Sequence, residues 1–232
     1  MKRKMWFYLF IISISLMFLI GCNKDDDTND NNDATVTDID GNVYHTVTIG
    51  TQVWMVENLK TTKYRNGEEI INVTDFHEWS TLATGAFCWF DNDTTYKINY
   101  GALYNWYAAI DTRNISPLGW HVPSDDEWTI LTNFLGGESV AGGKMKETGT
   151  SHWWGPNTGA TNESGFTALP GGHKSIDPFH MLPDIGMRAF WWSSSELSDS
   201  AALCWSINYT ESNLWHGYSN KQAGFSVRLV RD

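Results

Sequence analysis

The chain has 232 residues, three of them cysteines, and a formal net charge of −11. This length is ample for one hydrophobic core, and the negative charge argues against nucleic acid or an anionic lipid surface as a partner. The chain has 13 tryptophans and 20 glycines, which is typical of a loop-rich extracellular fold with short strands and argues against a helical bundle.

The N-terminal residues 1–21 have the pattern of a lipoprotein signal peptide. A basic start at residues 2–4 precedes an apolar stretch over residues 5–20, which is too short for a membrane-spanning helix. The stretch ends in Leu-Ile-Gly-Cys at residues 19–22 and resembles a lipobox, in which the cysteine receives a diacylglycerol and becomes the new N-terminus. We therefore expect a lipid on Cys22. The alternative is a plain secretory signal or an uncleaved anchor.

Residues 22–36 are expected to form a disordered acidic tether. Residues 23–33 contain no hydrophobic side chain, so they cannot bury enough surface to fold. Lys24 followed by acidic residues resembles the export signal that takes lipoproteins of Bacteroidetes-type bacteria to the outer face of the outer membrane; a generic solvated linker is the alternative. Loss of the three basic signal-peptide residues makes the mature net charge −14, and the folded domain is expected over residues 37–232.

The first part of the domain is expected to contain a hairpin and a short helix. Residues 43–49 alternate between apolar and polar, a Gly-Thr turn follows, and residues 52–56 return as a second strand. A buried run is expected at residues 87–90. Within residues 100–109, apolar side chains spaced by three and four predict one short helix.

The best-supported helix spans residues 124–135. Ser124 can cap its free amides, and Glu127 completes a capping box three residues later. Trp128, Leu131 and Leu135 form the apolar stripe. Three strands are then expected, at residues 189–193, 202–209 and 225–230, and the absence of a long repeat excludes solenoids and propellers.

Seven motifs in this order resemble the Fibrobacter succinogenes major paralogous domain family, over about 195 residues. The matching stretches are residues 37–44, 52–59, 100–106, 119–128, 165–172, 192–195 and 224–228. Members of that family look like surface lipoproteins and secreted modules without an established activity, for which adhesion and polysaccharide use are suggested.

More distantly, residues 120–128 and 224–228 resemble the C-type lectin-like fold of formylglycine-generating enzymes. The resemblance implies an α+β domain with twisted antiparallel strands, one or two helices and long structured loops. The enzymes of that fold need two reactive cysteines near the C-terminal end, whereas this chain has only Cys204 there. Its apolar neighbours favour an inert thiol, so enzymatic activity is not expected.

After lipidation two cysteines remain, Cys88 and Cys204, both in apolar-aromatic runs. In an oxidising compartment they could form a disulfide, and two free buried thiols are the equal alternative. Asp91 and Asp93 offer oxygen ligands for calcium, with an ordinary turn as the alternative. No histidine or cysteine spacing points to zinc.

Adjacent tryptophans suggest a surface for stacking sugars. Trp153, Trp154 and Trp215 are the candidate ligand-binding residues; the alternative is that they fill the core, which we expect of Trp191, Trp192 and Trp205. We therefore expect a non-catalytic, lipid-anchored binding or adhesion module on the cell surface, with a neutral or cationic glycan as its ligand. The alternatives are an accessory subunit that binds a surface protein, and an enzyme with an unrecognised site.

Overall fold

A computed structural model describes residues 34–177 and 184–232. The expected signal peptide, Cys22 and nearly all of the expected tether lie outside these residues. Chain contacts place Asp33–Asp232 in one compact unit. Within the described ranges, we find no helix that combines the length and the apolar character needed to cross a bilayer.

The described residues form a mixed α+β fold with antiparallel sheets and short helices. The strands are β1 (Thr35–Thr37), β2 (Val43–Ile49), β3 (Gln52–Met55), β4 (Ile71–Asn72), β5 (Ala86–Cys88), β6 (Leu103–Tyr104), β7 (Trp120–His121), β8 (Arg188–Glu196), β9 (Ala201–Asn208), β10 (Leu214–Asn220) and β11 (Val230–Arg231). The helices are α1 (Phe76–Ser80), α2 (Lys97–Tyr100), α3 (Trp106–Ala109), α4 (Asp125–Phe134) and α5 (Glu138–Met145), with 3-10 turns η1 (Phe90–Asn92) and η2 (Thr94–Tyr96).

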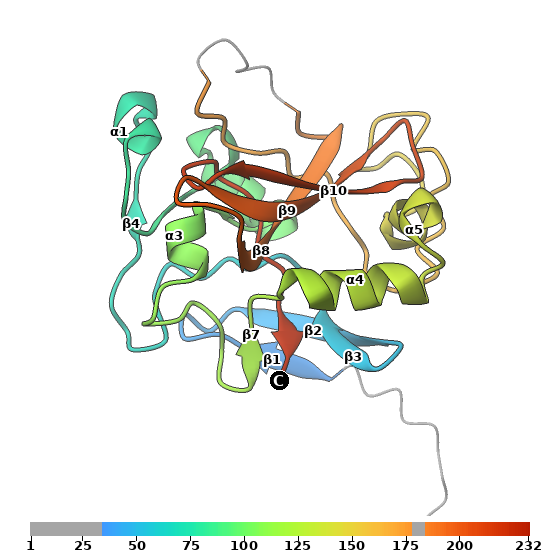
Figure 1. The fold of residues 1–232 in the computed structure, drawn as a ribbon, viewed down its shortest axis with the longest axis horizontal. Coiled ribbons are helices and arrows are strands. Elements are labelled where there is room, and N and C mark those ends of the chain that lie inside the picture. Colours follow the sequence, from blue (N-terminus) through green and yellow to red (C-terminus); the bar gives the residue numbers. More distant parts are fainter. Residues whose placement is uncertain (1–33, 178–183) are drawn as a thin grey trace, which may run out of the picture. The chain divides into compact units, whose positions relative to one another are not determined.

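One sheet has the strand order β1-β2-β3-β11-β7 and brings the two ends of the domain together. The predicted hairpin is confirmed as β2–β3, in which Thr46 pairs with Met55 and Ile49 with Gln52. The C-terminal strand β11 pairs with β3 and β7, at the bottom of Figure 1. Strand β1 includes Thr35 and Val36, two residues that the sequence assigned to the tether, because they pair with β2.

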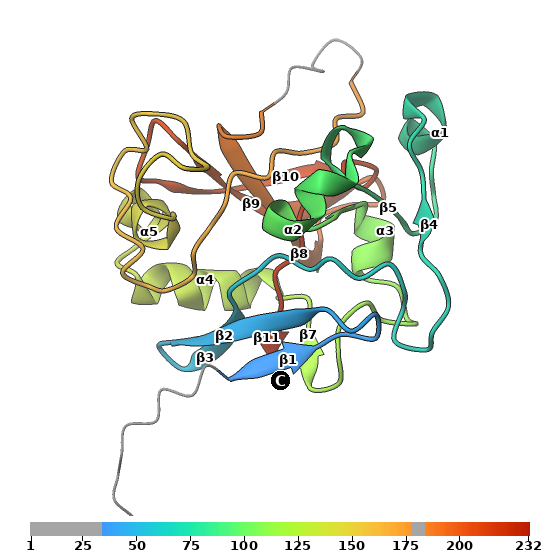
Figure 2. The ribbon, with the colours of Figure 1, turned by 180° about the vertical axis from the view of Figure 1, so that it is seen from behind.

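A second sheet has the order β10-β9-β8, and a third has the order β4-β5-β6. Figures 1 and 2 show α4 running between the β10-β9-β8 sheet and the β1–β3 strands. Trp128 of α4 contacts Trp54 of β3 at 4.9 Å between ring centroids and stacks on Trp205 of β9 at 6.1 Å. This one indole therefore joins the helix to both sheets.

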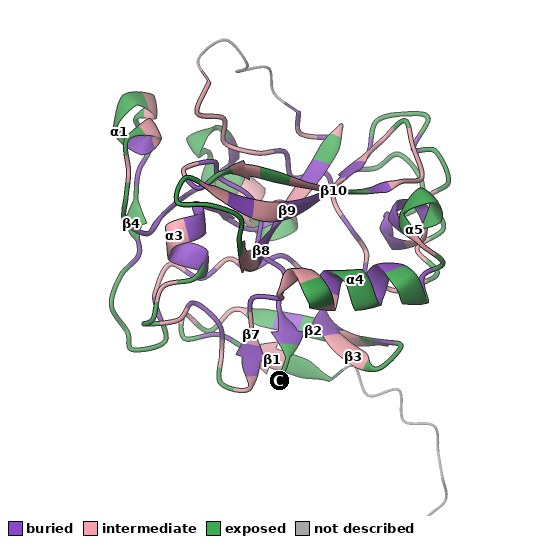
Figure 3. Ribbon diagram, in the orientation of Figure 1, coloured by how far each residue is buried: buried purple, intermediate pink, exposed green. Residues whose placement is uncertain are grey.

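The predicted helix at residues 124–135 is confirmed as α4. The Ser124 Oγ accepts a hydrogen bond from the Glu127 amide, and the Glu127 carboxylate accepts one from the Ser124 amide, which completes the capping box. Trp128 and Leu131 are fully buried, and the alternation of buried and exposed turns along α4 is visible in Figure 3. The expected apolar stripe is thus the face that packs against the sheets.

A buried arginine joins several of the motifs that define the sequence pattern. Arg228 is 1% exposed, and its guanidinium donates to the side-chain oxygen of Asn58 and to the carbonyls of Met55 and Phe166. The Trp191 indole donates to the same Asn58 oxygen at 2.9 Å. These motif residues therefore hold the core together.

Two expected elements form differently. Residues 100–109 do not make one helix, because the Asn105 backbone is extended and its side-chain oxygen accepts the amides of Ala86 and Ala108. The chain is consequently β6 followed by the single turn α3. Residues 225–230 were expected as one strand, but their backbone partners change along the segment, from Tyr104 to Leu59 and then to Met55. Only the last residue of that span belongs to β11.

Candidate functional site

The β10-β9-β8 sheet carries a hollow of about 410 Å³. The side chains around it combine aromatic rings, two imidazoles, a guanidinium and small polar groups. They belong to His173, Arg188, Phe190, Cys204, Ser206, Trp215, His216, Gly217, Tyr218, Ser219 and Phe225. No carboxylate is among these residues.

Strand register explains why distant residues meet here. Phe190 pairs with Ser206, which also pairs with Trp215, so the three stand in one row across β8, β9 and β10. Gly217 pairs with Cys204 in the next row on the same face. The hollow therefore has a floor of small residues between an aromatic residue on β8 and another on β10.

The other face of this sheet is closed by the core. Trp191, Trp205 and Leu214 are buried there with Trp128 of α4. On the face of the hollow, Trp192 is also fully buried, because it packs against Phe225 at 4.4 Å between centroids. The predicted core roles of Trp191, Trp192 and Trp205 are confirmed, since β8 is covered on both faces at this point.

The inner wall of the hollow is aromatic and rigid. Phe190 is half-buried and stacks on Phe225 with centroids 5.0 Å apart and an angle of 15° between the rings. The His173 ring lies 5.0 Å from Phe190 and 6.1 Å from Phe225. Three packed rings of this kind make a preorganised apolar surface.

The imidazole of His173 is oriented by Asp184. One carboxylate oxygen of Asp184 lies 2.6 Å from His173 Nδ1, and the other accepts the His173 backbone amide at 3.1 Å. Because a carboxylate can only accept, Nδ1 carries the proton. This leaves Nε2 without a hydrogen-bond partner among the residues that the structure describes.

Trp215 forms the outer wall and is 51% exposed. Its indole N–H donates to Glu211 at 2.9 Å, which fixes the ring while leaving its face accessible. Trp215 belongs to β10, and its pairing with Ser206 of β9 holds its backbone in place. A Cβ added at the neighbouring Gly217 would meet no atom within 4 Å, so this glycine keeps the hollow open.

The other two candidate tryptophans lie elsewhere. Trp154 is 55% exposed and packs against Tyr209, with 6.4 Å between centroids, but it does not line the hollow. Of the two alternatives for Trp153, the structure shows the core one. This ring is 1% exposed and its indole donates to the carbonyl of Ala168, because the adjacent pair turns one ring into the core and the other outward.

Cys88 and Cys204 are both free and buried, so of the two alternatives the structure contains the unpaired thiols. They belong to different core clusters. Burial raises the pKa of each thiol to about 12, and the negative charge of Asp125 acts in the same direction on Cys204. At neutral pH Cys204 is therefore a protonated thiol on the floor of the hollow, a poor nucleophile.

The acidic residues proposed for calcium do not converge. Asp91 and Asp93 are exposed, and the Asp93 carboxylate accepts the Thr95 amide at 2.8 Å as the cap of η2. Two further carboxylates on other loops are already paired, Glu163 with Lys144 and Glu196 with Lys221. Across residues 34–177 and 184–232, no three histidine, cysteine or acidic side chains are grouped so that they could hold a metal ion.

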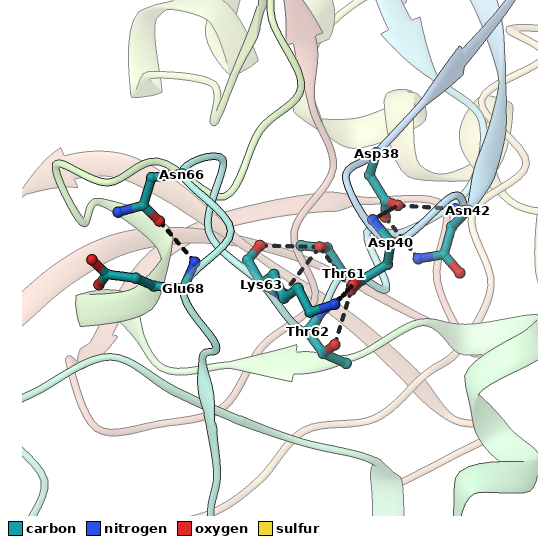
Figure 4. A network of polar contacts seen from close by, with 8 residues as sticks. All are labelled: Asp38, Asp40, Asn42, Thr61, Thr62, Lys63, Asn66 and Glu68. Carbon is teal, nitrogen blue, oxygen red and sulfur yellow. Dashed lines mark hydrogen bonds and ion pairs between the residues drawn. The ribbon is translucent and has the colours of Figure 1, made fainter.

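A second acidic cluster, at Asp38 and Asp40, is occupied by the protein's own donors (Figure 4). Asp38 accepts the backbone amides of Asp40 and Asn42 and the Tyr44 hydroxyl. Asp40 accepts the amide and hydroxyl of Thr62 and pairs with Lys63. This network fixes the turn into β2 and joins it to the following loop, so its role is structural.

Sequence reasoning missed most of the residues that line the hollow, including His173, Arg188 and Phe190. One signal could have revealed the sheet: Asn, Thr and Ser residues at 208–213 form a turn-rich segment between two apolar-containing runs. A hairpin there would have put Trp215 opposite Ser206. The contribution of His173 and Phe225 had no local signal, since both come from segments without regular strand structure around them.

The comparisons with known proteins identify a family. Residues 47–231 match the family model described as the Fibrobacter succinogenes major domain. No curated protein and no solved structure matches the chain. The matched span includes six of the seven sequence motifs and leaves out the first, residues 37–44. The chain belongs to the Fibrobacter succinogenes major domain family.

Proposed function

We propose that this chain is a lipid-anchored cell-surface module that binds carbohydrate in the hollow over β8, β9 and β10. The observation that carries the proposal is the half-exposed indole of Trp215, which Glu211 orients beside a floor of small residues. An oriented aromatic face suits the apolar face of a pyranose ring, and the surrounding hydroxyl and imidazole groups suit its hydroxyls.

The chemistry of the hollow favours binding over catalysis. Burial raises the pKa of the Cys204 thiol to about 12, which leaves little thiolate at neutral pH. The hydroxyl on β9 that lines the hollow, Ser206, has no hydrogen bond to a base among the described residues, whereas an activated serine needs one. We therefore propose a non-catalytic module.

The finer fold and the location belong to the same proposal. Antiparallel sheets flanked by short helices and long loops are consistent with a C-type lectin-like domain, the expectation drawn from residues 120–128 and 224–228. The lipobox-like residues 19–22 and the acidic stretch after Cys22 support a lipid anchor in the outer membrane with the domain facing outward. Such a module would hold the cell to a glycan, or a glycan to the cell.

The test uses the full chain, purified in detergent and applied to a broad glycan array. We expect millimolar or tighter binding to at least one glycan, and Trp215→Ala should weaken it by about 1–2 kcal/mol, as loss of an aromatic anchor commonly does. Trp154→Ala is the matched control, because its ring is equally exposed and lies outside the hollow. Equal effects of the two variants, or no bound glycan at all, would overturn the proposal.

One observation favours a second candidate, an accessory subunit that binds a surface protein. Ile130 and Phe134 lie one turn apart on α4 and are 48% and 63% exposed. Val140 at the start of α5 is exposed as well. Exposed apolar side chains grouped on helices are a feature of protein interfaces. If Phe134→Ser abolished recruitment of a surface protein while Trp215→Ala had no effect on it, this second function would be favoured.

A further inference from the structure

The charge inside the hollow is opposite to that of the chain. The mature chain carries −14, from which a neutral or cationic ligand was expected. Yet the residues around the hollow include a cation, Arg188, and no aspartate or glutamate. A ligand that enters it therefore meets a local environment that the net charge does not describe.

Arg188 is the cation best placed to bind a ligand. It stands on β8 two residues before Phe190, so both side chains leave the same face of the strand. Its guanidinium is exposed and forms no hydrogen bond or ion pair with any residue in the described ranges. An arginine offers a planar fork of donors that matches a carboxylate.

The nearby carboxylates are already engaged behind or beside the hollow. Asp184 is bound to His173, and Asp125 accepts His216 Nε2 at 2.9 Å and the Trp205 indole at 3.0 Å. Glu211 accepts the Trp215 indole. These carboxylates orient the rings of the hollow and do not neutralise Arg188. Their negative charges would still repel a densely charged polyanion, so the hollow favours a ligand with a single anionic group.

We propose that the hollow binds an acidic sugar, a pyranose that bears one carboxylate, as in a uronic acid. Arg188 binds the carboxylate, Nε2 of His173 forms a hydrogen bond with a ring hydroxyl, and the apolar face of the ring packs on Trp215. The Ser206 hydroxyl on the floor is available to a second sugar hydroxyl. This inference rests on the proposed carbohydrate-binding function and names its ligand class.

The size of the hollow agrees with this ligand. A volume of about 410 Å³ lies within the range of small-molecule sites, which is roughly 300–1,000 Å³. Gly217 has an ordinary strand backbone and open space beside its Cα, so neither strain nor packing requires a glycine here. A side chain at this position would instead occupy the space that the sugar needs.

The experiment presents uronic acid oligosaccharides on an array, each beside its methyl ester, to the full chain in detergent. The ester keeps the ring and removes the charge. We expect at least one acid to bind about tenfold more tightly than its ester, the scale of a charge-assisted pair. Arg188→Gln should remove that difference by weakening the acid alone. Arg231→Gln, an exposed arginine on β11, is the control and should preserve it.

Gly217→Val separates this inference from the proposed function, since it should block acid and ester alike without disturbing the strand. Esters that bind as tightly as acids, with both blocked by Gly217→Val, would overturn the acidic-sugar inference and leave carbohydrate binding in place. The inference would also be overturned if acids bound more tightly than their esters and Arg188→Gln did not change this difference. Absence of binding to any acid, ester or neutral glycan would overturn both.

Discussion

Arg228 brings a positive charge into the core without a carboxylate in contact. Its guanidinium bonds to Asn58 and to two carbonyls and lies 4.1 Å from the centroid of Phe166. Burial lowers its pKa to about 9, the cost of removing a cation from water. Lys146 is a second buried cation that backbone carbonyls stabilise, because its ammonium donates to the carbonyls of Thr158, Asn208 and Glu211.

The first prediction concerns this buried arginine. Arg228→Met should lower the free energy of unfolding by about 3 kcal/mol or more, because it leaves the carbonyls of Met55 and Phe166 buried without donors. Urea denaturation of the variant measures the loss. Arg231→Met is the control, since Arg231 is exposed, and it should change the midpoint little. An Arg228→Met midpoint equal to that of the control would contradict a structural role.

Tryptophan burial could be predicted only in part at this scale. Adjacent indoles predict one ring inward and one outward, and Trp153 and Trp154 follow this rule. Trp191 and Trp192 do not, because β8 is packed on both faces. Which ring of a pair is buried, and whether both are, depends on neighbours that are remote in sequence.

At the scale of elements, local signals revealed α4 and the β2–β3 hairpin but missed α5 and β10. The two glycines of α5 argue against a helix. In the structure they are needed for close approach, because a side chain at Gly142 would collide with the carbonyl of Asn213, and one at Gly143 with that of Gly159. Likewise, β10 is polar and contains Gly217, and its strand structure depends on pairing with β9.

The second prediction tests the start of α4. Ser124→Ala removes the hydroxyl that caps Glu127 and should lower the free energy of unfolding by about 1 kcal/mol. The urea midpoint is the measurement. Thr129→Ala is the control, because Thr129 is exposed within the same helix, and its midpoint should be unchanged or slightly higher. Equal midpoints for Ser124→Ala and the wild-type chain would mean that the cap contributes nothing.

The third prediction follows from the ring of His121, which joins α4 to the C-terminus. Its Nε2 lies 2.7 Å from Glu127 and its Nδ1 lies 2.6 Å from Asp232. Partial burial would lower the pKa of His121, but the hydrogen bonds from its ring to Asp232 and Glu127 outweigh burial and raise it. Since the folded pKa exceeds the unfolded value near 6.5, the stabilisation is fully present below that value and is lost as pH rises through the folded pKa.

The measurement is the difference in urea midpoint between the wild-type chain and His121→Gln at several pH values from 5 to 9. The difference should be largest at the acidic end and shrink as pH rises. His77→Gln, which changes an exposed histidine on α1, should give a smaller and different pH dependence. A difference that grows with pH would show that the imidazolium form does not hold these two carboxylates.

At the scale of the whole molecule, the family and the α+β class could be predicted from the sequence, whereas the site could not. Motifs spaced along 185 matched residues, from 47 to 231, share one core through Arg228, Asn58 and Phe166. The hollow, by contrast, is assembled from β8, β9, β10 and the segments around His173 and Phe225. No local pattern reports such an assembly, because it depends on strand register and on which segments cross the sheet.

The fourth prediction concerns the membrane anchor. Cys22→Ser removes the thiol to which the lipid would be attached, so we expect the variant to remain unprocessed or to be released as soluble protein. Fractionation of cells and mass spectrometry of the N-terminus measure this. Cys88→Ser is the control, because Cys88 is a buried thiol of the domain, and it should leave lipidation unchanged. A mature, acylated, membrane-bound Cys22→Ser chain would refute the assignment.

The last prediction concerns the proposed display of the domain on the outer face of the outer membrane. Lys24 and the three aspartates after it resemble a surface-export signal, and the proposed glycan site could meet glycans outside the cell only if the domain is displayed there. Proteinase K added to whole cells should therefore remove the domain from the cell pellet, while a periplasmic marker survives in the same sample. Replacing residues 24–27 with alanine should retain the lipid but protect the domain until the cells are lysed. If the wild-type chain is cleaved only after lysis, the domain faces the periplasm; if both chains are cleaved on whole cells, display does not depend on this acidic stretch.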